Sequence, residues 1–437
     1  MEYQIVKNTI PDNIDFGAIL SINTNSVTHN THGFHKYPAK FIPQIPQWAI
    51  NKYLKNQTGK LILEPFCGSG TTLVESALSG NYSIGIDVDP LSALISKVKT
   101  TKLDIVKLDL IIEWLKKNIE NPPKELFNPD CQTLEHWFTA ETINKLSIIR
   151  TLISQIVGDF GKEKAIKDIQ DFLLICFSSI IRRVSNADNE SQKTYVSHTK
   201  IKQPEEVFTL FFSQLDYFVE RITAFSSNSE LKPAEIIVSS STNSLSDLLG
   251  NRKADLAITS PPYIKAIDYI YNQMAELFWI GDLFQMQTQP LQNEKKTHYI
   301  GNKQILKKEF ADYSPFVSKT NIDSLDGKLQ QVFNTDKKNG HKHSYITYKY
   351  FVEMEQHFAE ISKCIKQNAH YVMIIGDSTV SDIYFDTADF LVQIAERNGF
   401  TLTNKWGYKI KNRYMRFDRK GRGGIIDIDW VLELKKN

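Results

Sequence analysis

The sequence predicts an α/β protein with a doubly wound, mostly parallel sheet that is interrupted by a helical subdomain. The observation with the most weight is residues 61–88, which read as strand, glycine turn, helix and strand within about 30 residues, the pattern of a parallel βαβ unit. Residues 101–230 instead carry apolar side chains at helical spacing. Beyond residue 233 strands and helices alternate again, so the insertion is expected to divide a single α/β domain.

The first hundred residues are expected to contain an N-terminal extended arm and then the βαβ unit. The arm covers residues 1–30, which are polar and rich in Asn and Thr. The elements predicted after it are a helix over 45–54, a strand over 61–66, a helix over 72–79, a strand over 82–88 and a helix from about Leu91.

We expect the chain to consist of three parts. Residues 1–100 begin the α/β domain, residues 101–232 form a helical insertion, and residues 233–437 complete the α/β domain. Within the insertion, helices are predicted over 104–119, 141–157, 163–184 and 205–224. In the third part, strands are predicted over 234–240, 254–260, 371–376, 401–410 and 425–434, and helices over 269–280, 348–366 and 387–398. Residues 282–345 are polar with little periodicity and are predicted to form a long functional loop.

Composition excludes several classes of protein. The 437 residues carry a net charge of +2, so any contact with nucleic acid must come from local basic patches. No apolar run approaches the roughly 20 residues of a membrane span, and no signal peptide is expected at the N-terminus. The four cysteines are scattered, which indicates neither a zinc site nor a disulfide framework and favours a reducing cytoplasm. No metal is expected.

A glycine turn and an acidic residue point to a nucleoside cofactor. Gly68 and Gly70 lie between a strand and a helix, where glycine lets the backbone approach a ligand closely. Asp87 ends the next strand, at a spacing that suits a carboxylate accepting both ribose hydroxyls. The turn has no P-loop lysine, which argues against ATP. Asp89 is a competing candidate, but Pro90 behind it indicates an N-cap, and a purely structural glycine turn remains an alternative.

A second motif, Thr259-Ser260-Pro261-Pro262-Tyr263, follows a predicted strand. Each proline fixes its own φ and lacks an N–H, so the segment is stiff while its carbonyls still accept hydrogen bonds. A hydroxyl, rigid carbonyls and an aromatic ring therefore meet at the carboxyl end of a strand, where open α/β sheets bind their ligands. The alternative is a rigid end to the strand with a packing tyrosine.

These motifs resemble those of the amino-directed DNA methyltransferases. Residues 64–71 (EPFCGSGT) are similar to their S-adenosyl-L-methionine (AdoMet) motif, and residues 259–263 (TSPPY) to their catalytic motif, in the serine form typical of cytosine-N4 enzymes. Residues 35–41 (HKYPAKF) resemble a segment that closes over the methionine end of AdoMet in one branch of the family. The order of motifs differs from the permuted order common among cytosine-N4 enzymes, since the AdoMet motif here precedes the catalytic one.

The resemblance implies a Rossmann-like AdoMet methyltransferase sheet, the cofactor AdoMet and a double-stranded DNA substrate. The implied catalytic residues are Ser260, Pro261, Pro262 and Tyr263. The implied cofactor-binding residues are Tyr37, Lys40, Phe41, Phe66, Gly68, Gly70, Thr71 and Asp87. The expected reaction is methylation of cytosine N4 at specific sites, within a restriction–modification or defence system that includes a partner endonuclease. Adenine-N6 methylation is the nearest alternative, followed by RNA or small-molecule methylation and by an inactive DNA-binding subunit.

Candidate DNA contacts come from basic residues in three places. Residues 405–422 contain eight Lys or Arg interleaved with aromatics, and Lys411, Arg413 and Arg416 are the candidates there; a solvated β-ribbon is the alternative. Arg182 and Arg183 either contact DNA or pair with acids inside the fold. The basic loop 282–345 is expected to face DNA. Recognition of the DNA sequence is expected in residues 101–232, in this loop, or in both.

Overall fold

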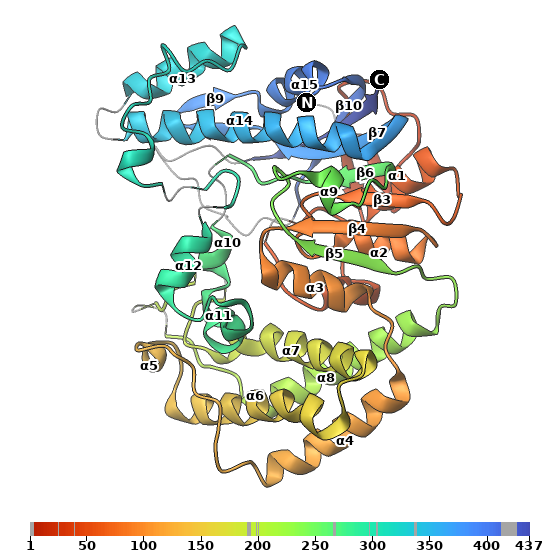
Figure 1. Ribbon diagram of the computed structural model, residues 1–437, viewed down its shortest axis with the longest axis vertical. Helices are drawn as coiled ribbons and strands as arrows, with labels where there is room; N and C mark the ends of the chain where they lie inside the picture. The colour runs from red at the N-terminus through yellow and green to blue at the C-terminus, as the bar shows by residue number, and fades with distance from the viewer. Residues whose placement is uncertain are drawn as a thin grey trace.

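The computed structural model describes residues 4–24, 26–38, 40–189, 194–197, 199, 201–264, 268–296, 298–302, 305–335, 339–411 and 426–437 (Figure 1). These residues form a nine-stranded sheet in the order β1-β2-β10-β11-β7-β6-β3-β4-β5. Its strands are β1 (Gln4–Lys7), β2 (Ile19–Asn23), β3 (Leu61–Glu64), β4 (Tyr82–Asp87), β5 (Ala234–Val238), β6 (Ala254–Thr259), β7 (Ile365–Gly376), β10 (Phe400–Lys409) and β11 (Ile428–Lys436).

The sheet is mostly parallel. Strands β3 to β7 pair in parallel with one another, and β11 is antiparallel to both of its neighbours, β7 and β10. The predicted doubly wound, mostly parallel sheet is therefore confirmed. Two strands from the predicted N-terminal arm, β1 and β2, extend the sheet at one edge, because β2 pairs with β10.

Helices cover both faces of the sheet. Successive side chains of a strand point to opposite faces, and apolar side chains on both faces need a covering layer. In β6, Leu256 and Ile258 belong to a core that includes α1 (Gln44–Leu54), whereas Ala257 between them belongs to the opposite core, formed with α14 (Gly340–Cys364) and α15 (Thr387–Arg397). The other helices of this α/β part are α2 (Thr71–Leu78), α3 (Pro90–Thr100) and α9 (Leu245–Leu248); the hairpin β8 (Ser378–Val380) and β9 (Ile383–Phe385) follows β7.

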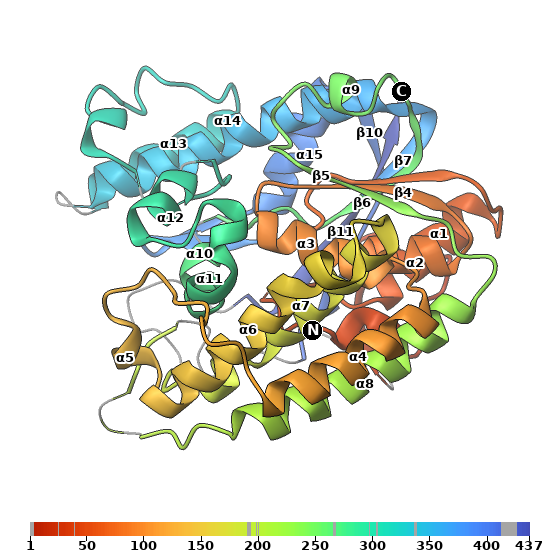
Figure 2. The ribbon, with the colours of Figure 1, turned by 60° about the horizontal axis from the view of Figure 1, so that its bottom comes forward.

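The predicted helical insertion forms a separate layer beside the sheet, at the bottom of Figure 1 and in front in Figure 2. Its helices are α4 (Ile105–Glu120), α5 (Leu134–Trp137), α6 (Ala140–Phe160), α7 (Lys164–Val184) and α8 (Val207–Ser227), which confirms the predicted helical segments. Their apolar faces share one core with α11 (Met274–Ile280), which follows α10 (Tyr269–Asn272). None of the helices in the described part of the chain is long and apolar enough to cross a membrane.

The prediction of a long loop over residues 282–345 is wrong. This segment contains α12 (Gln289–Lys296), α13 (Asp323–Thr335) and the start of α14. In α13 the buried residues Leu325, Leu329 and Val332 recur at helical spacing, but polar residues dominate the stretch and hide that pattern. The first turns of α14 bury small polar residues, Ser344 and Thr347, which carry no hydrophobic periodicity.

Candidate functional site

The glycine turn after β3 needs both of its glycines. Gly68 and Gly70 have positive φ values of 48° and 77°, which other residues adopt only with strain. A Cβ on Gly68 would lie 3.2 Å from Cε1 of Tyr37, and one on Gly70 would lie 2.9 Å from Oγ of Ser96. The Ser96 hydroxyl also donates to the Gly68 carbonyl at 2.8 Å. Helix α3, which carries Ser96, therefore fixes the shape of the turn.

Asp87 stands at the end of β4 and is held by the same turn. Its carboxylate accepts hydrogen bonds from the backbone N–H of Gly68 at 2.7 Å and of Asp89 at 2.9 Å. Burial, followed by the negative charge of Asp89, raises the pKa of Asp87 to about 7. The predicted N-cap role of Asp89 is confirmed, because its carboxylate accepts from the N–H of Leu91 at the start of α3. That leaves Asp87 as the carboxylate that faces the cavity.

A segment before α1 covers the turn. The Tyr37 ring packs over Gly68 and stacks on Tyr269 at a centroid distance of 5.7 Å, and its hydroxyl accepts from Ser92 at 2.9 Å. Lys40 donates to the backbone carbonyl of His32 at 3.0 Å. Tyr37, Lys40 and Phe41 all line one cavity together with the glycine turn. We name residues 26–41, apart from Ala39, the cover segment.

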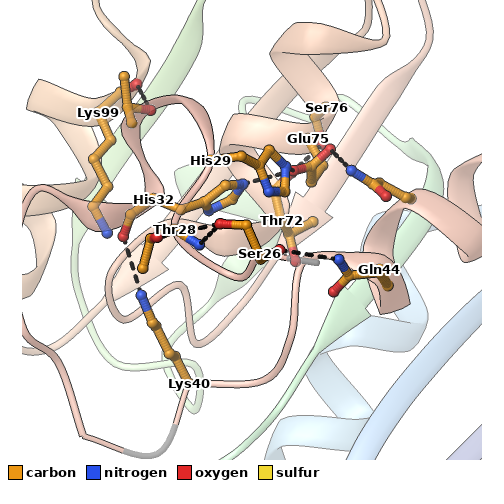
Figure 3. Close-up of polar contacts among 12 residues, drawn as sticks. Ser26, Thr28, His29, His32, Lys40, Gln44, Thr72, Glu75, Ser76 and Lys99 are labelled. Carbon is orange, nitrogen blue, oxygen red and sulfur yellow. Dashed lines mark hydrogen bonds and ion pairs between the residues drawn. The ribbon is translucent and has the colours of Figure 1, made fainter. Parts of the chain in front are cut away.

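The cover segment is anchored to α2 through a buried carboxylate. His29 and His32 both point at Glu75, with Nε2 atoms 3.2 and 2.6 Å from its Oε1 (Figure 3). Gln47 donates to the other oxygen at 2.9 Å. Burial alone would raise the pKa of Glu75, but the hydrogen bonds from the two histidines outweigh it and lower the pKa to about 2. The carboxylate is therefore ionised, and the hydrogen bond to it raises the pKa of His29.

These three side chains are also of types that bind metal ions, and sequence reasoning did not connect them. Their surroundings favour a hydrogen-bond network. The positive charge of Lys99 lies close enough to His32 to lower the pKa of that histidine, after burial, and Lys40 donates to the backbone of His32. The amino groups of Lys40 and Lys99 lie beside the cluster and repel a divalent cation whenever they are protonated. We therefore interpret the cluster as a structural anchor of the cover segment.

Replacing Glu75 with glutamine is expected to loosen this anchor. A neutral amide cannot hold a protonated His29, so the free energy of unfolding should fall by about 3 kcal/mol and AdoMet affinity should fall several-fold. The stabilisation from His29 is fully present below its ordinary pKa of 6.5 and declines as pH rises through its raised pKa. Thermal denaturation and calorimetry at several pH values measure both effects. Glu113→Gln, on the exposed face of α4, is the control, and equal behaviour of the two variants would contradict the anchor.

The motif that follows β6 lies on the other side of the cavity. Strand β6 ends at Thr259, Pro261 is buried, and Ser260 and Pro262 line the cavity. Tyr263 is absent from the lining, and its hydroxyl donates to Oδ1 of Asp429 on β11 at 2.7 Å.

The cavity brings together most of the predicted site residues. It encloses about 710 Å³ of empty space, its open mouth included. Of the predicted cofactor residues, Tyr37, Lys40, Phe41, Phe66, Gly68, Thr71 and Asp87 line it, and Gly70 does not, because it begins α2 behind the turn. The cavity is also lined by residues that the sequence analysis did not predict as part of the site, among them Ser239, Ser240, Ser241, Tyr269, His298, Tyr299 and Ile300. The serines follow β5, so the carboxyl-edge rule could have found them; residues 298–300 carried no signal.

The predicted DNA contacts are scattered. Arg183 forms a two-pronged ion pair with Glu205 at 2.8 and 2.6 Å at the surface, and Arg182 donates to the backbone carbonyl of Asp188 at 2.9 Å. A role of either arginine in DNA binding stays a prediction. Lys411 hydrogen-bonds to Asn23. Arg413 and Arg416 lie outside the described residues. The aromatics Trp406 and Tyr408 of β10 are buried, so they offer no exposed ring for stacking beside the basic residues.

Comparison with known proteins adds independent findings. Residues 4–97 match the model of a family described as DNA methylase, which groups N6 and N4 methyltransferases. The chain is 26% identical to the Type II methyltransferase M.MvaI of Kocuria varians over 93% of this chain and 89% of that protein. It is 38% identical to M.MjaII of Methanocaldococcus jannaschii over 28% of this chain and 24% of that protein. It is 24% identical to M.BsoBI of Geobacillus stearothermophilus over 86% of this chain and 79% of that protein.

Proposed function

Since this chain belongs to the amino-directed DNA methyltransferases, an AdoMet-dependent family, we propose that it methylates N4 of cytosine at specific sites in double-stranded DNA. The observation that carries the proposal is the position of Ser260, which lines the same cavity as Gly68 and Asp87. A partner endonuclease in a restriction–modification system is part of the proposal, supported by relatives that are named Type II methyltransferases. A cytoplasmic location is proposed from the scattered cysteines.

The cavity fits AdoMet. Its volume lies in the range of small-molecule sites, and Asp87 offers a carboxylate to two ribose hydroxyls. The hydroxyls of Ser241 and Tyr299 line the cavity and are buried without a hydrogen-bond partner among the described residues, so they are available to a polar ligand. Gly68 lets the backbone approach the ligand, and Tyr37, Lys40 and Phe41 would cover its methionine end.

The chain's own residues would activate the amino group. When bound, AdoMet supplies an electrophilic methyl group on a sulfonium. The lone pair of a cytosine amino group is delocalised into the ring, so the nitrogen is a poor nucleophile. Ser260 and the Pro261 carbonyl would accept its two hydrogens, which favours a pyramidal nitrogen and builds up charge there. Most of the rate would come from positioning and a preorganised polar environment.

The target base must leave the duplex to reach this cavity, because an amino group inside a stacked helix is inaccessible. Pro262, which lines the cavity, would pack against the flipped base. Stacking of Tyr263 on the base stays a prediction, since this ring does not line the cavity. Adenine-N6 methylation is the second candidate, because the motif order, with the AdoMet motif first, weakens the case for cytosine that the serine makes. Sequence recognition by residues 101–232 or 282–345 stays a prediction.

The test is mass spectrometry of nucleosides from the DNA of cells that express the protein. We expect N4-methylcytosine, absent from cells that express Ser260→Ala. N6-methyladenine instead would replace the proposed base while keeping the reaction. Unmodified DNA alongside methylated RNA would overturn the proposal of a DNA substrate.

A further inference from the structure

Residues 298–302 lead from α12 past the cofactor cavity to the catalytic motif, although no sequence motif contains them. They follow α12, whose buried Lys296 forms an ion pair with Asp268, the N-cap of α10, at 3.4 Å. Figures 1 and 2 both show α12 beside α10. Backbone hydrogen bonds fold the segment into a turn, because Tyr299 donates to the Lys296 carbonyl at 3.3 Å and Asn302 donates to the Tyr299 carbonyl at 3.2 Å. We name residues 298–302 the strap.

The strap contributes a tyrosine to the cofactor cavity. Tyr299 and Ile300 line this cavity together with Asp87. The Tyr299 hydroxyl is buried and has no hydrogen-bond partner among the residues that the structure describes. Burial, followed by the negative charges of Asp89 and Asp87, raises the pKa of Tyr299, so the hydroxyl stays protonated and can both donate and accept. Since buried polar groups in native proteins are hydrogen-bonded, we expect this hydroxyl to pair with a polar ligand in the cavity.

The surroundings of Tyr299 correspond to the adenosine side of the cavity. The carboxylates that act on it most strongly, Asp89 and Asp87, stand at the end of β4, where the ribose contact is proposed. Ser241, a second lining residue with a buried and unpaired hydroxyl in the described part of the chain, follows β5, the parallel neighbour of β4. Ser260 follows β6, on the far side of β3. Adenosine can supply the partner, because it carries ribose hydroxyls, ring nitrogens and an amino group.

We propose that Tyr299 is a cofactor-binding residue whose hydroxyl hydrogen-bonds to the adenosine part of AdoMet. The inference rests on the proposed function, because it assigns a further contact to the same cavity. It gives a partner to a hydroxyl that is otherwise buried at a cost.

The strap touches the catalytic motif through a glycine. Gly301 has a φ of 73°, and a Cβ there would lie 3.3 Å from the backbone carbonyl oxygen of Tyr263 and 3.5 Å from Cδ2 of Tyr350 on α14. The absence of a side chain at residue 301 therefore lets the strap lie against the segment that follows Ser260. Because Tyr299 and Gly301 are two residues apart, the cofactor contact and the contact with the catalytic motif belong to one turn.

The experiment measures by calorimetry how Tyr299→Phe binds AdoMet and 5′-methylthioadenosine, which carries the adenosine but lacks the amino acid. Both affinities should fall by the same factor, roughly 3- to 10-fold, because one hydrogen bond to a neutral partner is lost. Turnover on bacterial genomic DNA that lacks the modification should be unchanged at saturating AdoMet. The melting temperature without cofactor should not fall, since no described residue pairs with the hydroxyl that is removed.

Tyr350→Phe is the matched control. The Tyr350 hydroxyl is also buried without a hydrogen-bond partner in the described part of the chain, but Tyr350 does not line the cavity. Its affinities for both ligands should equal those of the wild type. Wild-type affinities in Tyr299→Phe would overturn the inference. A loss for AdoMet alone, with unchanged binding of 5′-methylthioadenosine, would overturn the assignment to adenosine.

Gly301→Ala tests the contact with the catalytic motif. It should weaken AdoMet binding several-fold and also lower kcat at saturating AdoMet by roughly 10-fold, because the added methyl group pushes the strap away from the Tyr263 carbonyl. Gly250→Ala is the control, since Gly250 also has a positive φ, 57°, but a Cβ there meets nothing within 4 Å. Equal kcat in the two variants would show that the strap does not position the catalytic segment. A wild type that binds AdoMet but transfers no methyl group to DNA contradicts the proposed function instead, and the binding comparison at Tyr299 still stands.

Discussion

Replacing Ser260 with alanine is expected to remove most of the methyl transfer while leaving AdoMet binding intact. Ser260 lines the cavity at the end of β6, whereas the ribose contact is proposed at Asp87 on β4. Loss of one preorganised partner of the reacting group costs roughly 100- to 1,000-fold in kcat. Single-turnover transfer of labelled methyl groups to DNA measures the rate, and calorimetry measures the affinity for AdoMet.

Ser362→Ala is the matched control for this variant. The Ser362 hydroxyl donates to the Ala359 carbonyl within α14, away from the cavity. Its turnover should equal that of the wild type. Unchanged turnover in Ser260→Ala would remove Ser260 from the catalytic machinery, and with it the reason to favour cytosine over adenine.

Replacing Asp87 with alanine is expected to weaken AdoMet binding by roughly 10- to 100-fold. Two hydrogen bonds to a charged acceptor are lost, each worth about 1.5–3 kcal/mol before compensation by water, and the N–H of Gly68 loses its partner. In the wild type, affinity should be full above the pKa of about 7 and should decline as pH falls below it, because ribose hydroxyls donate to the ionised carboxylate. Asp87→Asn should abolish this pH dependence.

Asp89→Ala separates the two carboxylates. Asp89 caps α3, so its loss should lower the free energy of unfolding by about 1 kcal/mol and leave the intrinsic AdoMet affinity nearly unchanged. Calorimetry and thermal denaturation of both variants decide the assignment. The ribose contact would move to Asp89 if Asp89→Ala weakened AdoMet binding and Asp87→Ala did not.

Much of this fold followed from local signals in the sequence. The short apolar runs indicated the buried strands, and the glycine turn lay between two of them. Because ligands gather at the carboxyl ends of parallel strands, these signals predicted that Gly68, Asp87 and Ser260 share one edge of the sheet, as they do. The helices of residues 282–345 were missed because their buried positions are few or polar, as Ser344 and Thr347 in α14 are.

Contacts made by single residues far apart in the chain carried no signal. Tyr263 and Asp429 are 166 residues apart, and their partnership depends on where an antiparallel strand enters the sheet. His32 and Glu75 are 43 residues apart and meet because the cover segment folds back over α2. Both pairs place a carboxylate out of water, where its partners decide its charge, and that depends on tertiary structure alone.

The anchor at Glu75 also bears on how fast the cofactor can be exchanged. Helix α2 begins at the glycine turn beneath the cofactor cavity and carries Glu75, which holds the cover segment above it. The lower and upper walls of the cavity are therefore attached to one short helix. We expect the residence time of the cofactor to depend on the free energy of opening this anchor, in which the histidines leave a buried carboxylate.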